Sequence, residues 1–214
     1  MSLIFYTNPM SRGRIARWML EEVGVPYETV VLDYASTMKG ADYLAINPMG
    51  KVPAIVHDGK VVTEGAAICA YLADAFPEAG LAPPTTERAD YYRWLFFAAG
   101  PAEQAVTNKS MGFAPTAEQG RMAGYGNFDL MVDVLEKAVS AHDYLAGDRF
   151  TAADVYAGSQ VAWGRQFGSL PQRDAFDAYL ARILSRPAYK RAGEIDDALI
   201  AAAQAQTKAP VETA

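Results

Sequence analysis

The sequence predicts a mixed α/β module followed by an all-helical domain, and three observations support this division. Strand-like and helix-like patterns alternate over the first 78 residues. No strand pattern follows residue 86, where apolar residues recur at helical spacing. The intervening residues 77–84 (PEAGLAPP) are rich in proline and glycine, which is typical of a linker. We therefore expect domains at 1–78 and 86–203, a linker at 79–85 and a frayed tail at 204–214.

The module is predicted to begin with a strand, a helix and a second strand. Residues 3–7 are apolar and aromatic, which favours a strand. Residues 12–23 carry apolar side chains at helical spacing, and Gly24 is a stop signal for that helix. Residues 27–32 form the second predicted strand. This order predicts two parallel strands joined by a right-handed crossover.

A hairpin and a further helix are predicted to complete the module. Strands at 52–56 and 60–63 flank Asp58-Gly59, a dipeptide that favours a two-residue hairpin turn with positive φ angles. A helix is expected over residues 65–75, ending before Pro77. The module is therefore a β-α-β unit followed by a β-β-α unit.

The second domain is predicted to contain only helices. Thr116-x-x-Gln119 has the pattern of a capping box, so a long helix is expected to begin there. Thr151-x-x-Asp154 has a similar pattern, which indicates a role in folding and not in catalysis. The predicted helical stretches are 87–109, 116–142, one that opens at Thr151, 174–185 and 188–203, with Pro187 between the last two.

The bulk properties of the chain exclude several classes of partner. The 214 residues carry a formal net charge of −6, which disfavours binding to a phosphate backbone. No apolar run reaches the ~18 residues of a membrane span, and the N-terminus lacks the pattern of a signal peptide. We therefore expect a cytoplasmic protein that binds neither nucleic acid nor membrane.

The sulfur and imidazole groups indicate no metal site. Cys69 is the single cysteine, so no internal disulfide can form, and its apolar neighbours indicate a buried structural thiol. His57 and His142 are isolated and are expected on the surface. Because no Cys/His cluster has metal-ligand spacing, no metal is expected.

Residues 51–72 combine features of a site for a small anionic peptide. Pro53 begins a predicted strand, where a trans peptide bond is the common form. A cis bond between Val52 and Pro53 would instead turn the Val52 N–H and C=O outward, where they could pair with a bound peptide backbone.

Glu64-Gly65 stands at the start of a predicted helix, whose unpaired N–H groups favour a carboxylate ligand. The Glu64 carboxylate either binds a ligand ammonium group or only complements the helix dipole. Residue chemistry alone leaves both readings open.

The loop from Tyr6 to Ser11 joins the first strand to the first helix, and Ser11 falls at the N-cap position. Its hydroxyl either only caps the helix or also stabilises a thiolate. Keeping a thiol of pKa about 8.5 ionised at pH 7 requires about 2.7 kcal/mol. A charge-assisted hydrogen bond contributes about 1.5–3 kcal/mol, so one hydroxyl is sufficient in magnitude.

These elements, in this order, resemble the cytosolic glutathione transferase superfamily, in particular its bacterial beta- and theta-like, serine-type members. The resemblance is carried by NPMGKVPAIV, VVTEGAAICAYLAD and GDRFTAADV and covers about residues 1–203. It implies an α/β N-terminal thioredoxin-like domain, an all-α helical bundle domain and a homodimer. It also implies glutathione as a co-substrate, with no separate cofactor.

The resemblance assigns roles to residues of the 51–72 segment. Val52-Pro53 matches the family's cis-proline element, whose first residue pairs with the cysteinyl backbone of glutathione. Lys51, with Lys39 as a second candidate, is implied to reach the glycyl carboxylate.

Glu64 and Gly65 match the pair that holds the γ-glutamyl head of glutathione. The family usually has Ser or Thr at the position of Gly65. One hydroxyl hydrogen bond is therefore lost here, which amounts to about 1 kcal/mol of binding.

The catalytic position has two candidates. Ser11 stands where the beta-class pattern often has cysteine, and it is the preferred thiol-activating residue. Tyr6 is the alternative, because it ends the first strand as the tyrosine of tyrosine-type enzymes does. The second substrate is expected between this loop and the helical domain, lined by Met10, Asn108 and Trp163, although core packing also explains a tryptophan.

The resemblance implies a transferase that binds glutathione, stabilises its thiolate and conjugates it to a small hydrophobic electrophile. The alternatives on the same fold are a glutathione-dependent reductase, isomerase or ether-cleaving enzyme. A non-catalytic binding protein is the alternative from a different class.

Overall fold

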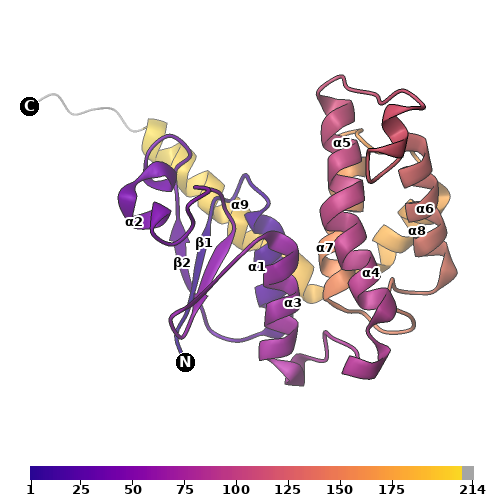
Figure 1. Ribbon diagram of the computed structural model, residues 1–214. Helices are drawn as coiled ribbons and strands as arrows, with labels where there is room; N and C mark the ends of the chain where they lie inside the picture. The colour runs from indigo at the N-terminus through magenta and orange to yellow at the C-terminus, as the bar shows by residue number, and fades with distance from the viewer. Residues whose placement is uncertain (209–214) are drawn as a thin grey trace, which may run out of the picture. The chain divides into compact units, whose positions relative to one another are not determined.

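The computed structural model describes residues 1–208, which form two compact units (Figure 1). The first unit comprises residues 1–68 and the C-terminal residues 187–208, and the second comprises residues 69–186. This division differs from the predicted domains because the last helix belongs to the first unit. It also falls inside helix α3 (Gly65–Ala75) and not in the segment at 79–85.

The first unit contains a four-stranded mixed sheet in the order β2-β1-β3-β4. The strands β1 and β2 are parallel, as the β-α-β pattern predicts, and β3 is antiparallel to both β1 and β4. The elements are β1 (Leu3–Thr7), α1 (Gly13–Val23), β2 (Glu28–Val31), β3 (Ala54–His57) and β4 (Lys60–Thr63).

Local signals explain where these elements turn or end. Asp58 (φ 46°) and Gly59 (φ 78°) form the predicted two-residue hairpin turn between β3 and β4. Gly24 ends α1 with φ 73°, and its N–H donates to the Leu20 carbonyl, as expected for a left-handed helix cap.

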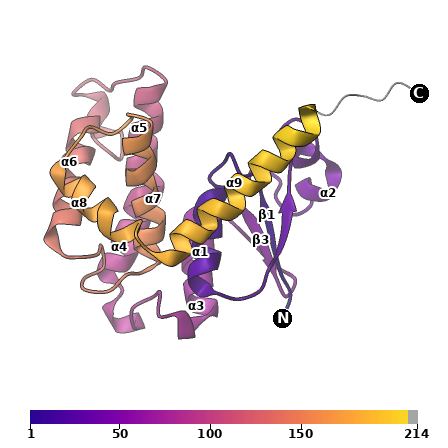
Figure 2. The same cartoon turned by 180° about the vertical axis from the view of Figure 1, so that it is seen from behind.

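The last helix, α9 (Pro187–Lys208), lies against α1 in the first unit (Figure 1, Figure 2). Pro187 is its first residue, a position where the missing N–H costs nothing. The helix continues through residues 204–208, so this part of the predicted frayed tail is helical. Residues 209–214 lie outside the described residues.

A short helical segment connects β2 to β3, and a small hydrophobic core lies next to it. The segment comprises a 3-10 helix (Thr37–Lys39) and α2 (Ala41–Leu44). Next to it lies a cluster of apolar and aromatic side chains: Leu32, Met38, Tyr43 and Ala54, with Tyr6, Val30, Ile46 and Val52 packed against them.

The regular elements of the second unit are helices, apart from one isolated β-bridge between Tyr144 and Gly147, and the helix boundaries correct two predictions. The predicted helix at 87–109 is interrupted at residues 98–102, which have π-helical geometry around Pro101. The unit contains α4 (Ala89–Phe97), α5 (Glu103–Ser110), α6 (Phe128–Ala141), α7 (Ala152–Gln166) and α8 (Asp174–Ile183).

The long helix predicted to begin at Thr116 begins instead at Phe128. Thr116 and Gln119 do exchange the hydrogen bonds of a capping box, at 2.8 and 3.2 Å. However, they head only a 3-10 turn, and Asn127 caps α6 through a 2.9 Å bond from the Leu130 N–H. The segment therefore contains two capped starts, and the long helix follows the second of them, at Asn127.

The capping box at the start of α7 is confirmed. The Thr151 N–H donates to Asp154 Oδ2 at 2.9 Å, and Thr151 Oγ1 accepts from the Ala153 N–H at 3.3 Å. Asp154 is fully buried and also accepts from the Leu145 N–H and the Tyr179 hydroxyl. Its carboxylate therefore holds three segments of the second unit together, which is a folding role.

Two further observations concern Cys69 and the membrane. Cys69 is fully buried, and burial raises the pKa of its thiol, which agrees with an inert structural role. Among the described residues, no helix has both the length and the apolar character needed to cross a bilayer.

Candidate functional site

Four of the predicted site residues line one pocket of about 200 Å³ in the first unit. They are Ser11 from the β1–α1 loop, Lys39, and Lys51 and Val52 from the segment before β3. The complete lining is Ser11, Arg12, Tyr34, Met38, Lys39, Gly50, Lys51 and Val52. The structure thus brings together residues from three separate stretches of the sequence.

The Ser11 hydroxyl lies in a fixed local network. It donates to the Asn8 carbonyl at 2.6 Å and accepts from the Gly13 N–H at 2.9 Å. The N-cap residue of α1 is Arg12 and not the predicted Ser11, although the Ser11 hydroxyl still accepts from the N–H of the first helical residue, Gly13. The hydroxyl has to give up the Asn8 bond before it can donate to a ligand.

Gly13 permits a close approach between α1 and β1. A Cβ atom at this position would lie 2.0 Å from Thr7 Oγ1 and 3.0 Å from Ser11 Oγ. Thr7 is fully buried, so its side chain has no space into which to retreat. The absence of a side chain at Gly13 therefore allows the start of α1 to lie in contact with Thr7 at the end of β1.

Val52 presents backbone groups at the edge of the site. The peptide bond to Pro53 is cis, the isomer that the family resemblance implies. Within residues 1–208, neither the Val52 N–H nor its C=O has a hydrogen-bond partner in the chain.

The backbone before Val52 is held firmly. The Lys51 carbonyl accepts hydrogen bonds from the Tyr43 hydroxyl and from Asn47 Nδ2, the latter at 2.8 Å. The Lys51 side chain is exposed. Hydrogen bonds therefore fix the backbone of Lys51, while its side chain lies at the pocket.

Lys39 reaches the same segment from the other side. Its ammonium group donates to the Gly50 carbonyl at 2.6 Å. Gly50 has φ 57°, which favours glycine, and a Cβ atom there would also lie 2.9 Å from Lys39 Nζ and 3.1 Å from the Met38 carbonyl oxygen.

Glu64 and Gly65 do not line the pocket but lie at the same end of the sheet. Ala54 of β3 pairs with both Tyr6 of β1 and Thr63 of β4. Pro53 directly precedes Ala54 and Glu64 directly follows Thr63, so the two predicted elements are neighbours at this end of the antiparallel pair. Glu64 is exposed and has φ 65°, an uncommon conformation for a residue with a side chain.

Tyr6 belongs to the small core and not to the pocket lining. Its ring contacts the Tyr43 ring with centroids 5.6 Å apart. Partial burial raises the pKa of Tyr43, whose hydroxyl is committed to the Lys51 carbonyl. These contacts give Tyr6 a packing function beside the pocket.

The three residues predicted for a second-substrate pocket lie in different surroundings. Met10 is 70% exposed, and its carbonyl accepts a 3.3 Å hydrogen bond from the Tyr34 hydroxyl in the first unit. In the second unit, Asn108 Nδ2 donates to the Tyr125 hydroxyl at 3.0 Å, and Trp163 is half-buried in α7. The shared pocket stays a prediction.

Four lining residues were missed by sequence reasoning: Arg12, Tyr34, Met38 and Gly50. The available signal for Arg12 was its position directly after Ser11. No local pattern marks Tyr34, which the chain brings to the pocket through the loop after β2. With Arg12, Lys39 and Lys51, the lining contains three cations and no carboxylate, so the pocket favours an anion.

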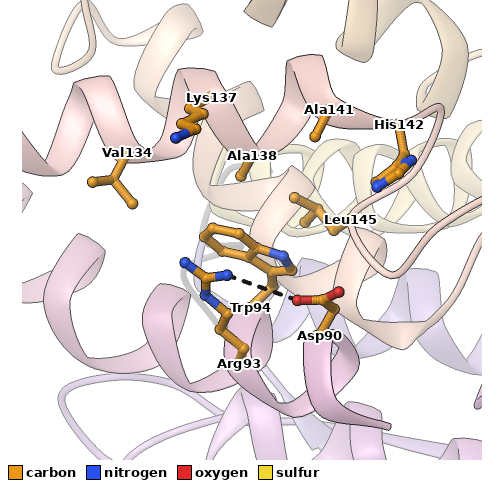
Figure 3. A pocket seen from close by; sticks show the side chains of 9 residues that line it. All are labelled: Asp90, Arg93, Trp94, Val134, Lys137, Ala138, Ala141, His142 and Leu145. Carbon is orange, nitrogen blue, oxygen red and sulfur yellow. Dashed lines mark ion pairs between the residues drawn. The ribbon is translucent and has the colours of Figure 1, made fainter. Parts of the chain in front are cut away.

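A second pocket, of about 340 Å³, lies between α4 and α6 in the second unit (Figure 3). The Arg93 guanidinium lies 4.5 Å from the centroid of the Trp94 ring and 3.8 Å from the Asp90 carboxylate. None of the predicted site residues lines this pocket. Its lining is Asp90, Arg93, Trp94, Val134, Lys137, Ala138, Ala141, His142 and Leu145.

Comparisons with family models cover most of the chain. Residues 10–75 match the N-terminal domain of glutathione S-transferase, and residues 96–187 match the C-terminal domain of glutathione S-transferase.

Curated relatives agree with these matches. Glutathione S-transferase GST-4.5 of Xanthomonas campestris pv. campestris is 34% identical over 84% of this chain and 92% of its own length. Glutathione S-transferase GstA of Escherichia coli O157:H7 is 30% identical over 92% of this chain and 97% of its own length.

Solved structures give the same result. A glutathione transferase from Methylococcus capsulatus superposes with a TM-score of 0.75 at 30% identity, over 91% of this chain and 98% of its own. A sphingomonad glutathione S-transferase in complex with glutathione superposes with a TM-score of 0.74, at the same identity and coverage.

Proposed function

This chain belongs to the glutathione S-transferase family, and we propose that its pocket beside Ser11 binds glutathione for conjugation to a small hydrophobic electrophile. The observation that carries the proposal is the convergence of Ser11, Lys51 and Val52 on one cation-lined pocket. Glutathione carries two carboxylates and one ammonium group, so it is a net anion whose charge suits this lining.

Each part of the peptide has a candidate partner in the first unit. The unpaired Val52 N–H and C=O pair with the cysteinyl backbone, in the manner of an added strand. Lys51, assisted by Lys39, binds the glycyl carboxylate. Glu64 binds the γ-glutamyl ammonium group, and the Gly65 N–H at the start of α3 binds the γ-glutamyl carboxylate.

Ser11 is the residue that we propose to orient the thiol. Its hydroxyl exchanges the bond to the Asn8 carbonyl for a charge-assisted bond to the sulfur, which is the stronger of the two. The thiol proton leaves to solvent, and the thiolate then attacks the electrophilic carbon. A C–S bond forms as the leaving group departs or the ring or double bond opens, and proximity supplies much of the gain in rate.

The remaining features of the proposal concern the surroundings of the reaction. We place the electrophile beside Met10 in the first unit, and we expect a cytoplasmic homodimer that needs no metal or further cofactor. Cys69 is fully buried, so the chain offers no exposed thiol for a disulfide-exchange mechanism.

Spectroscopic titration of bound glutathione tests the proposal. The thiolate absorbs in the ultraviolet, so its absorbance against pH gives the thiol pKa in the complex. We expect a pKa below that of free glutathione for the wild type, a higher value for Ser11→Ala and no change for Tyr6→Phe. Failure of the wild type to bind immobilised glutathione, or to lower the thiol pKa, would refute the proposed function.

A further inference from the structure

We propose that Asn8 is a positioning residue of the transfer reaction, whose side-chain amide fixes the turn from which the Ser11 hydroxyl reaches the thiol of bound glutathione. The inference rests on the proposed function and deepens it, because it assigns the group that orients Ser11. It is carried by the hydrogen bonds of Asn8 and by the recurrence of the same turn on the Lys51 side of the pocket.

Asn8 connects the loop of Ser11 to the end of β2 through its side chain. The residue is only 8% exposed, its Nδ2 donates to the Leu32 carbonyl at 2.8 Å, and its Oδ1 accepts from the Met10 N–H at 2.9 Å. The Leu32 N–H in turn donates to the Thr7 carbonyl at 2.8 Å, so this anchor lies where β1 and β2 end. One amide therefore closes the turn and ties it to the sheet.

The Asn8 carbonyl holds Ser11 through two hydrogen bonds, from the Ser11 N–H at 3.1 Å and from its hydroxyl at 2.6 Å. When the hydroxyl donates to the sulfur instead, the bond from the N–H remains. The cost of leaving a buried acceptor without a donor is therefore avoided. Because Ser11 Oγ also accepts from the Gly13 N–H at 2.9 Å, the oxygen can stay in place while its hydrogen turns from the carbonyl to the sulfur.

The same turn stands on the Lys51 side of the pocket. Residues 47–49 repeat the sequence Asn-Pro-Met of residues 8–10, and in each turn the Asn carbonyl accepts from the N–H three residues later. Asn47 Oδ1 accepts from the Met49 N–H at 3.1 Å, and its Nδ2 donates to the Lys51 carbonyl at 2.8 Å. Each asparagine thus closes its own turn and binds a carbonyl outside it. Asn8 serves the thiol side of the proposed site, and Asn47 serves the side of the glycyl carboxylate.

The other contacts of the first turn are weaker than those of Asn8. The Pro9 carbonyl accepts from the Arg14 guanidinium and the Met10 carbonyl accepts from the Tyr34 hydroxyl, each at 3.3 Å. Both distances are long for a hydrogen bond. Loss of the Asn8 amide therefore loosens the turn, although this amide binds only backbone groups of the chain.

Asn8→Ala tests this role, with Asn47→Ala as the matched control. The thiol pKa of glutathione bound at saturation is measured from thiolate absorbance. The Kd is measured by calorimetric titration at a pH below that value, so that ionisation of the thiol does not contribute to it.

The two variants are expected to show opposite patterns. A hydrogen bond weakens steeply as its geometry departs from linear, so Asn8→Ala should raise the thiol pKa by about 0.5–1 and leave the Kd unchanged. Asn47→Ala should raise the Kd and leave the bound thiol pKa unchanged. Asn8→Ser keeps an acceptor for the Met10 N–H, so its pKa rise should be smaller, and it provides the measurement if Asn8→Ala does not fold.

A double-mutant cycle with Ser11→Ala separates positioning from a general effect on the fold. Because Asn8 acts through the Ser11 hydroxyl, Asn8→Ala should raise the thiol pKa no further when residue 11 is already alanine. An equal rise in both backgrounds would show that Asn8 does not act through Ser11 and would overturn the assignment.

The outcomes separate this inference from the proposed function. If Ser11→Ala raises the thiol pKa while Asn8→Ala and Asn8→Ser keep the wild-type value, Asn8 is not a positioning residue and the proposed function stands. If the wild type binds no glutathione, the proposed function fails and the assignment of Asn8 fails with it.

Discussion

Arg17 Nε lies 2.7 Å from Asp196 Oδ1, and each of the two side chains is 1% exposed. The pair joins α1 to α9 across 179 residues of sequence. Arg17 also donates to the Tyr27 hydroxyl at 3.0 Å and lies over the Phe5 ring at 5.1 Å from its centroid. One buried cation thus connects the helix that carries the site loop, the sheet and the C-terminal helix.

Removing the carboxylate of this pair is expected to destabilise the protein strongly. Asp196→Asn leaves Arg17 charged and buried without its counter-ion, which typically costs about 3–5 kcal/mol. Urea-induced unfolding measures the change in the free energy of unfolding. Asp197→Asn is the control, because that residue is 68% exposed in its pair with Arg14 and should cost less than about 1 kcal/mol. Equal effects of the two substitutions would contradict a structural role for the buried pair.

Gly13→Ala is expected to lower the free energy of unfolding by about 1–3 kcal/mol, because its Cβ would overlap Thr7 Oγ1. Gly193→Ala in α9 is the matched control, since nothing lies within 4 Å of its Cβ position and alanine should add about 0.5–1 kcal/mol. Thr7 Oγ1 is buried without a hydrogen-bond partner, so Thr7→Ala should relieve part of the Gly13→Ala loss. A stabilising Gly13→Ala would show that the contact is absent.

Tyr27 predicts a pH dependence at the alkaline end. Burial, followed by its 2.7 Å hydrogen bond to Glu21, raises the pKa of Tyr27 to about 12. Between the unfolded value of about 10 and this value, the unfolded chain releases the phenolic proton while the folded protein keeps it. The stability that Tyr27 contributes is therefore complete below pH 10 and is lost as pH rises to about 12.

Unfolding measurements on wild type and Tyr27→Phe between pH 8 and pH 12 isolate this contribution. The difference between their free energies of unfolding should be constant below about pH 10 and should shrink above it. A difference that stays constant over the whole range would mean that the phenol titrates alike in both states.

Gly65→Ser is expected to tighten glutathione binding. The substitution returns a hydroxyl at the start of α3, where it can bond the γ-glutamyl carboxylate. One such bond contributes about 1 kcal/mol, or roughly a fivefold lower Kd. Calorimetric titration measures it, with Ala66→Ser as the control that should leave the Kd unchanged. Weaker binding by Gly65→Ser would show that the head group does not approach this position.

The parts of the fold that follow from short-range signals could be predicted from the sequence. The hairpin depends on Asp58-Gly59, and the cap of α7 depends on Thr151 and Asp154, so each is determined within a few residues. The interruption of the predicted 87–109 helix at residues 98–102 also had a local signal, Pro101, which the apolar pattern around it outweighed. The late start of α6 follows from a second cap at Asn127.

Long-range features had no such signal. Arg17 and Asp196 each lie in an ordinary helical pattern, and only the packing of α9 on α1 makes them partners. Likewise, the loop after β2 brings Tyr34 to the pocket. The sequence alone does not show that Arg12 lines the same pocket as Lys39 and Lys51. Family resemblance supplied the candidate binding residues, whereas the net positive charge of the whole pocket lining could be recognised only from the structure.

The central claim is that glutathione binds in the pocket beside Ser11, and calorimetric titration of glutathione into two lysine variants tests it most directly. Lys51 lines this pocket, whereas Lys60 is an exposed lysine of β4 outside it. Lys51→Met should raise the Kd about tenfold, since a hydrogen bond to a charged group contributes about 1.5 kcal/mol or more, and Lys60→Met should leave it unchanged. Equal affinities for wild type and Lys51→Met, or an equal loss in both variants, would contradict the account.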